Sequence, residues 1–545
     1  MLRKSCPRGS TNSLYLLALG SLVVVGLLAY LLLTPAQRSR GIRRNTDDTT
    51  NTTQATSGTP ESHTNDPGTN ELLMYCAAGM RYPLEQIAEK YAAEYGVRIN
   101  LQYGGSNTLL NQLEVNKTGD LFLAADASYV RLAEEKGLTV EAFPLAVMKP
   151  VIAVQAGNPK NIQGVADLAR EDVKVALGDP DAAAIGGTTR SLLSASGHWS
   201  ALEPRVTHSG VFKPTVNEVA NAVKLGSVDA GIIWDSTAVQ YDELVAVEAP
   251  ELDAGTANIE VSVVAFSKNP TAAIHFARYL SARDRGLETF RATGFMAVDG
   301  DVWEEHPELT FFAGAVNRAA LEPIIKEFQE REGVTVNAVF NGCGILTATM
   351  RGIVGGQAGS FPDVYMACDV YYLEAVNELF QDAVNVSDTD IVIVTQKDNP
   401  KNISSLADLA NPGVRVVLGQ PDKCTIGVLS QRLLQAEGLY EKITANGNLV
   451  NQTTSSAFLI PQVATGAADA VLAYRTDTRA EGERLGVINV DSQLAKAIQP
   501  FSVARSSDHK YLGRRLFAKL AQSRDKFESK GFNWLLDDHR SANAN

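Results

Sequence analysis

Short apolar runs and amphipathic segments alternate along most of the chain. Val97–Tyr103 (VRINLQY) and Val173–Leu177 (VKVAL) are short and contain branched residues, which is typical of strands. The segments that begin at Leu84 (LEQIAEKYAAEY) and at Val216 (VNEVANAVKLG) carry apolar residues at helical spacing. Strands that alternate with helices predict an α/β fold with mostly parallel sheets.

The same pattern occurs twice in the chain. Asn158–Ile162 (NPKNI) recurs unchanged as Asn399–Ile403, at an offset of 241 residues. Further matches keep their order through both halves, and their offsets drift by only a few residues, as loop insertions produce. We therefore predict two tandem modules, residues 71–300 and 308–538, each with two α/β lobes and a ligand cleft between them.

An uncharged apolar stretch precedes the first module. Residues 13–33 (SLYLLALGSLVVVGLLAYLLL) are long enough, at ~1.5 Å per residue, to cross a hydrocarbon core of about 30 Å. We predict a transmembrane anchor or uncleaved signal at 13–34, after a short N-terminal segment (1–12). A removed signal peptide is the alternative. Residues 35–70 are predicted to be a disordered linker, and 539–545 a tail.

Composition narrows the classes of function. The formal net charge of −13 argues against nucleic-acid binding, because phosphate backbones are held by clustered Lys and Arg. It does not argue against a small anion, since N–H groups at helix N-termini supply a local positive field. The chain has no P-loop, nucleophile elbow or metal-hydrolase motif. We predict a protein that is not an enzyme and uses neither a cofactor nor a metal.

Turns made of small residues are the candidate binding elements of the first module. Each follows a strand and precedes a helix, so each exposes unpaired N–H groups, and small side chains let an anion approach the backbone. Ligands of α/β folds bind at this edge of the sheet. The four turns are residues 76–80, 104–108, 178–186 and 213–217.

These stretches resemble the molybdate/tungstate substrate-binding proteins of ABC transporters, which have the type 2 periplasmic-binding fold. The resemblance is carried by Tyr103–Glu114 (YGGSNTLLNQLE), Gly119–Asp126 (GDLFLAAD) and Val175–Gly186 (VALGDPDAAAIG). It covers about residues 72–297 and, more faintly, 310–536. The resemblance implies two lobes that close over a tetrahedral oxyanion held by hydrogen bonds alone.

The resemblance also implies a set of ligand positions in the first module. A family serine is replaced by glycine at the first position, and a second serine is kept. The third and fourth positions are backbone N–H groups, and the fifth has tryptophan in place of tyrosine, whose indole N–H still donates one bond. With two neighbours, the predicted ligand-binding residues are Gly79, Met80, Ser106, Asn107, Ile185, Val216 and Trp234.

The second module departs further from the family pattern. Its matching residues are Val316, Cys343, Ile426, Ser456 and Tyr474. Each missing hydrogen bond to a charged ligand forfeits about 1.5–3 kcal/mol. We therefore expect the first module to bind a related oxyanion or a ligand with an organic part, and the second to be degenerate.

Two cysteines of the second module, Cys343 and Cys424, lie in turns that should face the cleft from opposite lobes. They are either two unpaired thiols, a disulfide that locks this module closed, or ligands of a soft metal. Cys368 follows a strand and is predicted to belong to the core.

The functional hypothesis is an extracytoplasmic receptor, anchored to the inner membrane by residues 13–34, that delivers a tetrahedral oxyanion to an ABC transporter permease. The alternative is a membrane-anchored sensory or scaffold protein that uses the same binding fold. Both hypotheses place the modules outside the cytoplasm, and neither involves nucleic acid.

Overall fold

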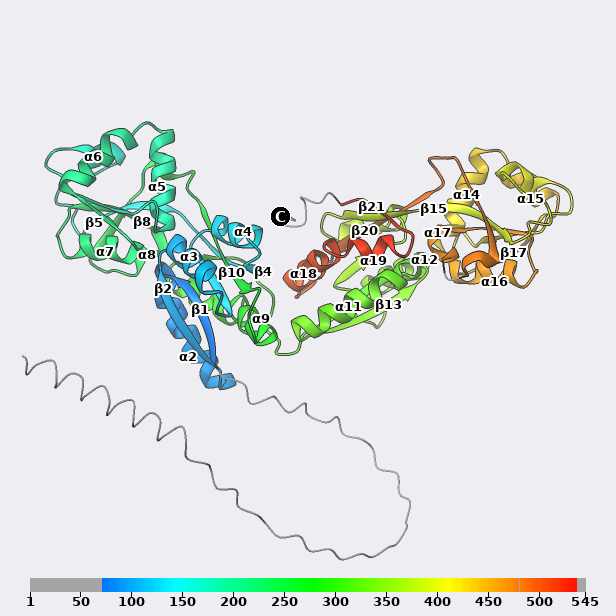
Figure 1. Ribbon diagram of the computed structural model, residues 1–545, viewed down its shortest axis with the longest axis horizontal. Coiled ribbons are helices and arrows are strands. Elements are labelled where there is room, and N and C mark those ends of the chain that lie inside the picture. Colours follow the sequence, from blue (N-terminus) through cyan, green and yellow to red (C-terminus); the bar gives the residue numbers. More distant parts are fainter. Residues whose placement is uncertain (1–70, 480, 537–545) are drawn as a thin grey trace, which may run out of the picture. The chain divides into compact units, whose positions relative to one another are not determined.

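The computed structural model describes residues 71–479 and 481–536, which hold two successive α/β modules (Figure 1). The first begins with β1 (Glu71–Ala77) and the second with β12 (Glu308–Gly314). Each has its own buried apolar core, one drawn from residues 72–295 and the other from 309–532. The predicted α/β class and the tandem duplication are confirmed.

The predictions for the two ends of the chain concern residues that the structure does not describe. The segments 1–12, 13–34, 35–70 and 539–545 all lie outside the described residues. Within the two described stretches, no helix has both the length and the apolar character that crossing a membrane requires. The anchor therefore stays a prediction from the sequence.

The first lobe of the first module is a six-stranded sheet with helices packed on it. Besides β1 it contains β2 (Arg98–Gly104), β3 (Leu121–Ala124), β4 (Thr139–Met148), β10 (Ala257–Val264), β11 (Met296–Ala297), α2 (Arg81–Tyr95), α3 (Ser106–Asn116), α4 (Ala127–Glu135), α9 (Pro270–Leu280) and α10 (Gly286–Ala292). The strand order is β11-β4-β10-β3-β1-β2. β1 is parallel to both β2 and β3, so the turns that leave these strands meet at one edge of the sheet.

The second lobe is a five-stranded sheet in the order β7-β6-β8-β5-β9. Its elements are β5 (Pro150–Gln155), β6 (Val175–Gly178), β7 (Val211–Lys213), β8 (Ala230–Trp234), β9 (Leu244–Val247), α5 (Ala184–Ala195), α6 (Trp199–Ser209), α7 (Val216–Lys224) and α8 (Asp235–Val239). β6 is buried throughout and parallel to β7 and β8. Helices α5, α7 and α8 therefore begin at the carboxyl edge of these strands, where ligands bind in such folds.

Two connections join the lobes. Lys149 alone separates β4 from β5, which belong to different sheets, and the chain returns between β9 and β10. The N–H of Lys149 donates to Oδ1 of Asp235 at 3.1 Å, and the N–H of Asp235 donates to the carbonyl of Lys149 at 2.9 Å. These bonds fix the crossing to the start of α8, and a pair of short connections is a geometry suited to hinge motion.

The second module repeats this plan with one difference. Its elements are β13 (Thr335–Asn341), β14 (Val364–Met366), β15 (Val384–Gln396), β16 (Val416–Gly419), β17 (Leu449–Thr453), β18 (Ala470–Tyr474), β19 (Leu485–Asn489), β20 (Lys496–Val503), β21 (Asn533–Trp534), α11 (Arg318–Glu332), α12 (Cys343–Val354), α13 (Val370–Glu374), α14 (Thr425–Ala436), α15 (Tyr440–Ala445), α16 (Leu459–Ala464), α17 (Arg475–Thr478), α18 (Lys510–Ala521) and α19 (Arg524–Glu528). Here β15 runs unbroken through both lobes, pairing first with β20 and then with β18. This one strand takes the places that β4 and β5 occupy in the two sheets of the first module.

Candidate functional site

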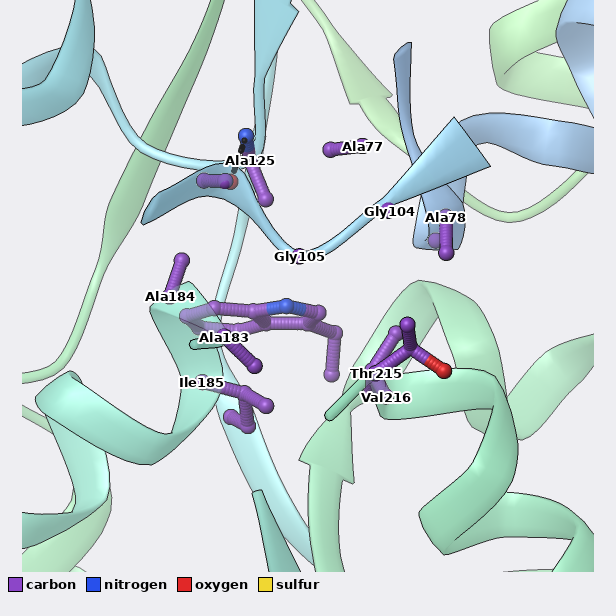
Figure 2. A pocket seen from close by; sticks show the side chains of 13 residues that line it. Ala77, Ala78, Gly104, Gly105, Ala125, Ala183, Ala184, Ile185, Thr215 and Val216 are labelled. Atoms are coloured by element: carbon purple, nitrogen blue, oxygen red, sulfur yellow. Dashed lines mark hydrogen bonds between the residues drawn. The ribbon is translucent and has the colours of Figure 1, made fainter. Parts of the chain in front are cut away.

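Turns from both lobes of the first module surround a small cavity (Figure 2). Its volume is about 20 Å³, slightly above the ~10–15 Å³ that one water molecule needs. All four small-residue turns of the first module contribute to it, and no charged side chain does. The thirteen lining residues are Ala77, Ala78, Gly79, Gly104, Gly105, Ser106, Ala125, Ala183, Ala184, Ile185, Thr215, Val216 and Trp234. The size favours a compact solute over one with an organic group.

Ser106 supplies a hydroxyl group from the first lobe. It is the first residue of α3 and is 1% exposed. Its Oγ accepts a hydrogen bond from the N–H of Ala125 at 3.1 Å. Because the oxygen already accepts this bond, its own proton remains available for a solute in the cavity.

Ile185 and Val216 present backbone N–H groups from the second lobe. Ile185 is the second residue of α5 and Val216 is the first of α7. Amides in the first turn of a helix have no acceptor within the helix, and this end carries a partial positive charge. The Thr215 side chain accepts a hydrogen bond from the N–H of Glu218 at 3.3 Å. This cap therefore satisfies the third amide of α7 and does not engage the amide of Val216.

Gly79 leaves room for a hydroxyl group that the sequence did not identify. A Cβ at Gly79 would lie 3.1 Å from Cγ1 of Val216 and 3.8 Å from Oγ1 of Thr237. The Thr237 hydroxyl is buried and has no hydrogen-bond partner among the described residues. Sequence reasoning missed Thr237 because nothing in its local pattern distinguishes it from an ordinary threonine in a short helix.

The remaining predicted residues of the first module have different placements. Trp234 is buried at the end of β8 and lines the cavity. Met80 is fully buried but is not among the lining residues. Asn107 also lies outside the lining and connects the lobes instead. Its N–H donates to the carbonyl of Ala182 at 3.1 Å, and its Nδ2 donates to that of Asp181 at 2.7 Å.

The cleft is closed in this structure, and at Gly105 the backbones of the two lobes lie close together. A Cβ at Gly105 would overlap the carbonyl oxygen of Ala182 and lie 2.7 Å from that of Pro214. Both carbonyls belong to the second lobe, whereas Gly105 belongs to the first. Only glycine lets the lobes meet this tightly.

Acidic side chains near the site accept hydrogen bonds from backbone N–H groups. Oδ1 of Asp235 accepts from the N–H groups of Lys149 and Ser236, at 3.1 and 2.7 Å. Burial raises the pKa of Asp235, and these two bonds oppose that effect. Asp179 similarly accepts from the N–H of Asp181 at 2.9 Å. No charged side chain lines the cavity, so the positive ends of the amide dipoles at the starts of α5 and α7 are what it offers to a solute, a chemistry suited to an anion.

The equivalent place in the second module carries different side chains. Val316 is buried where the first module has glycine, and Cys343 begins α12 as Ser106 begins α3. Ile426 is the second residue of α14, and Ser456 starts the 3-10 turn Ser456–Phe458 that precedes α16. Tyr474 ends β18, and its buried hydroxyl has no hydrogen-bond partner within the described part of the chain.

A buried carboxyl group further distinguishes the second module. Asp477 stands three residues after Tyr474, as Thr237 stands three after Trp234. Burial raises the pKa of Asp477 to about 7, and the Ser456 side chain opposes this shift. A carboxyl group that becomes negative near neutral pH disfavours an anion in this cleft.

Cys343 and Cys424 are two unpaired thiols, which is the first of the three alternatives drawn from the sequence, and Cys343 contacts the sulfur of Cys368 instead. The Sγ of Cys343 lies 2.6 Å from that of Cys368, whereas Cys424 donates to the carbonyls of Gln420 and Thr453, each at 3.6 Å. All four cysteines in the described ranges are thiols. The sulfur neighbour of Cys343 is therefore Cys368, from the same lobe, because β14 ends beside the start of α12. No group of three or more His, Cys, Asp or Glu in these ranges is placed to hold a metal ion.

Comparison with known proteins identifies the family. Residues 72–296 and 309–533 each match the family described as bacterial extracellular solute-binding protein. The molybdate-binding protein ModA of Mycobacterium tuberculosis is 29% identical over 220 residues, 39% of this chain and 80% of that protein. ModA of Escherichia coli is 24% identical over 233 residues, 41% of this chain and 88% of that protein.

Among solved structures, the chain is similar to the periplasmic molybdate-binding protein of Azotobacter vinelandii. The TM-score is 0.37 at 17% sequence identity, over 41% of this chain and 98% of that one. Each of these likenesses spans about the length of one module. Since the family match covers both modules, the chain belongs to the family of bacterial extracellular solute-binding proteins.

Proposed function

We propose that the first module binds a compact tetrahedral oxyanion of the molybdate or tungstate type. The observation that carries this proposal is an uncharged cavity lined by the Ser106 hydroxyl and by the first-turn amides of α5 and α7. Donors of this kind replace the hydration shell of an anion without a bound cation, and each contributes about 1.5–3 kcal/mol with a charged acceptor. The relatives named as molybdate-binding proteins support the same class of solute.

Two further donors complete the proposed site. The indole N–H of Trp234 replaces the tyrosine hydroxyl that the family resemblance implies. The unpartnered hydroxyl of Thr237, close to the space above Gly79, replaces the missing serine. Both side chains come from the end of β8 and the start of α8, so they approach the solute from the second lobe together with Ile185 and Val216.

The second module, in this proposal, is a structural partner that does not bind the anion. The buried side chain of Val316 stands at the position of Gly79, and a thiol replaces the Ser106 hydroxyl. The buried carboxyl group of Asp477 adds a charge of the wrong sign as the pH rises through about 7.

Calorimetric titration of the full-length protein with molybdate, tungstate, sulfate and phosphate tests the proposal. We expect one anion per chain and a preference for the larger tetrahedral ions. Ser106→Ala should weaken binding by about 10- to 150-fold, because one hydrogen bond to a charged group is lost. The matched control is Cys343→Ser at the equivalent position of the second module, which should leave affinity unchanged. Failure of all four anions to bind, or equal affinity in Ser106→Ala and wild type, would refute the assignment.

We propose that the modules act outside the cytoplasm, tethered by residues 13–34, and deliver the anion to an ABC permease. The family name, which describes extracellular proteins, supports this location. Uptake of labelled molybdate by the native host, with and without the gene, tests delivery. Lower uptake in the deletion strain is expected. Unchanged uptake together with a lost transcriptional response to molybdate would instead favour the sensory role.

A further inference from the structure

A pair of thiols in the second module has no part in anion binding. Cys343 begins α12, and Cys368 lies two residues beyond the end of β14. Their Sγ atoms are 2.6 Å apart, and the N–H of Cys368 donates to the Sγ of Cys343 at 3.0 Å. The two residues are 0% and 5% exposed. The two sulfurs are therefore close enough for a bond to form between them.

Comparison of the two modules shows that the protein accommodates this pair. In the first module the corresponding residues are Ser106 and Ala125, and the Ala125 N–H makes the same bond to the Ser106 Oγ at 3.1 Å. The backbone geometry is therefore shared, and only the side-chain chemistry differs.

A third replacement makes room for the sulfurs. Gly314 ends β12 where Ala77 ends β1. A Cβ at Gly314 would overlap the Cys368 sulfur and lie 2.9 Å from that of Cys343. At these three positions the first module thus has two alanines and a serine, whereas the second has a glycine and two thiols that fit together. Random loss of an unused site would not produce such a matched set.

The surroundings give the two thiols different roles. Burial raises the pKa of the Cys343 thiol, but the hydrogen bonds with Cys368 and the nearness of the Tyr365 and Thr425 hydroxyls outweigh this effect, so the pKa is lowered overall. The hydrogen bond with Cys343 and burial together raise the pKa of Cys368. The N-terminal position of Cys343 in α12 also favours its thiolate. Cys343 is therefore the nucleophile and Cys368 the thiol that responds.

We propose that Cys343 and Cys368 are a redox-active dithiol, which a small disulfide such as oxidised glutathione converts to an intramolecular disulfide. The Cys343 thiolate attacks one sulfur of the small disulfide, forms a mixed disulfide and releases one thiolate. Cys368 then loses its proton to that thiolate and attacks the Sγ of Cys343, which releases the second thiolate. Two protein thiols are oxidised and one disulfide is reduced to two thiols. Extracytoplasmic compartments are oxidising, so a disulfide formed in this way persists there.

Opening of the second cleft controls access to the pair. The carbonyl oxygen of Lys423, from the second lobe, lies 2.8 Å from where a Cβ of Gly342 would be, directly before Cys343. The hydroxyl of Tyr372, from the first lobe, donates to the carbonyl of Pro421 in the second lobe at 3.3 Å. The oxidant reaches the thiols when these contacts separate. Tyr372→Phe removes the second contact and should speed oxidation by about two- to tenfold.

The experiment uses the reduced full-length protein, incubated with oxidised glutathione, quenched with acid, alkylated and mapped by mass spectrometry of its peptides. We expect a linked Cys343–Cys368 peptide that lacks two hydrogen atoms, in wild type and faster in Tyr372→Phe. Cys424→Ser should behave as wild type. In Cys368→Ser, the mixed disulfide should accumulate on Cys343, which identifies the nucleophile.

Cys76 serves as an internal control because it is equally buried and has no thiol partner among the described residues. It should remain unoxidised throughout. A Cys343–Cys424 link would overturn the proposal, as would alkylation of both Cys343 and Cys368 after incubation of Tyr372→Phe. These outcomes are independent of anion binding, so they do not bear on the function proposed for the first module.

Discussion

Substitution of Gly105 tests whether solute binding depends on closure of the first cleft. In Gly105→Ala, the added Cβ would overlap the carbonyl of Ala182 and lie 2.7 Å from that of Pro214, both on the opposite lobe. Neither carbonyl can move away without moving the backbone around it. The Ala182 carbonyl accepts a hydrogen bond from the Asn107 N–H, and both carbonyls belong to the backbone that leads into helices α5 and α7. The lobes must therefore stay apart.

The magnitude follows from the donors that the open form loses. The solute keeps the Ser106 hydroxyl on its own lobe but loses the donors of the other lobe, among them the amides of Ile185 and Val216. At about 1.5–3 kcal/mol for each bond to a charged group, the two amides alone account for a loss of about 3–6 kcal/mol, and the Trp234 and Thr237 side chains would add to it. Affinity should therefore fall by a factor of at least about 10² to 10⁴.

Titration calorimetry with molybdate measures this loss. Gly164→Ala is the matched control, because a Cβ there meets no atom within 4 Å and the backbone is extended. It should bind as wild type does. The melting temperature of Gly105→Ala without anion should stay close to wild type, since the open form is free of the overlap. If Gly105→Ala bound molybdate within threefold of wild type, the closed cleft would have no role in affinity and this reasoning would fail.

Two further substitutions test individual side chains. Thr237→Val keeps the shape but removes the hydroxyl, so molybdate affinity measured by calorimetry should fall at least tenfold if Thr237 donates to the anion, and unchanged affinity would remove it from the site. For Asp477, burial raises the pKa in the folded state from 3.8 to about 7, so the folded state retains a proton that the unfolded chain has lost, and stability falls as the pH rises between these values. Asp477→Asn should therefore increase the free energy of unfolding at pH 8 by at most about 4 kcal/mol, and raise the melting temperature of the second module accordingly. Near pH 4 the substitution should change both little. Equal gains at both pH values would contradict the shift.

The fold could be predicted from the sequence because the pattern is local and is present twice. The predicted strand Val173–Leu177 corresponds to β6, and the predicted helix from Leu84 falls inside α2. The repeat then predicted where one module ends and the next begins. The unbroken β15 could not be predicted, because its place in both sheets depends on pairing with β18 and β20, which lie far along the chain.

The site was predictable where the backbone supplies the chemistry. The small-residue turns indicated the cavity, and five of the seven predicted residues of the first module line it. Asn107 contacts the opposite lobe through Asp181 and Ala182, which depends on how far the lobes close. Thr237 was not identified, and Cys368 was predicted only as a core residue, which its burial confirms. Each matters because of a neighbour distant in sequence, and neither lies in a recognisable motif.

The second module shows which part of the proposed site belongs to the fold and which to the side chains. Ile426 and Ser456 still stand in first turns, so their amides persist. What differs is a valine that fills space, a thiol that cannot replace a hydroxyl, and a buried acid. Val316→Gly, Cys343→Ser and Asp477→Thr together should therefore create a second anion site.

Calorimetry would then find two molybdate ions per chain in the triple variant. With Ser106→Ala added, the first site should weaken by about 10- to 150-fold while the new one is unaffected. The affinity of the new site should also be independent of pH near neutrality, because the triple variant no longer contains the Asp477 carboxyl group. A stoichiometry that stayed at one, in a triple variant that melts like wild type, would mean that the backbone of the second module has itself diverged. The amides at Ile426 and Ser456 would then no longer converge, and side chains alone would not explain why one module binds.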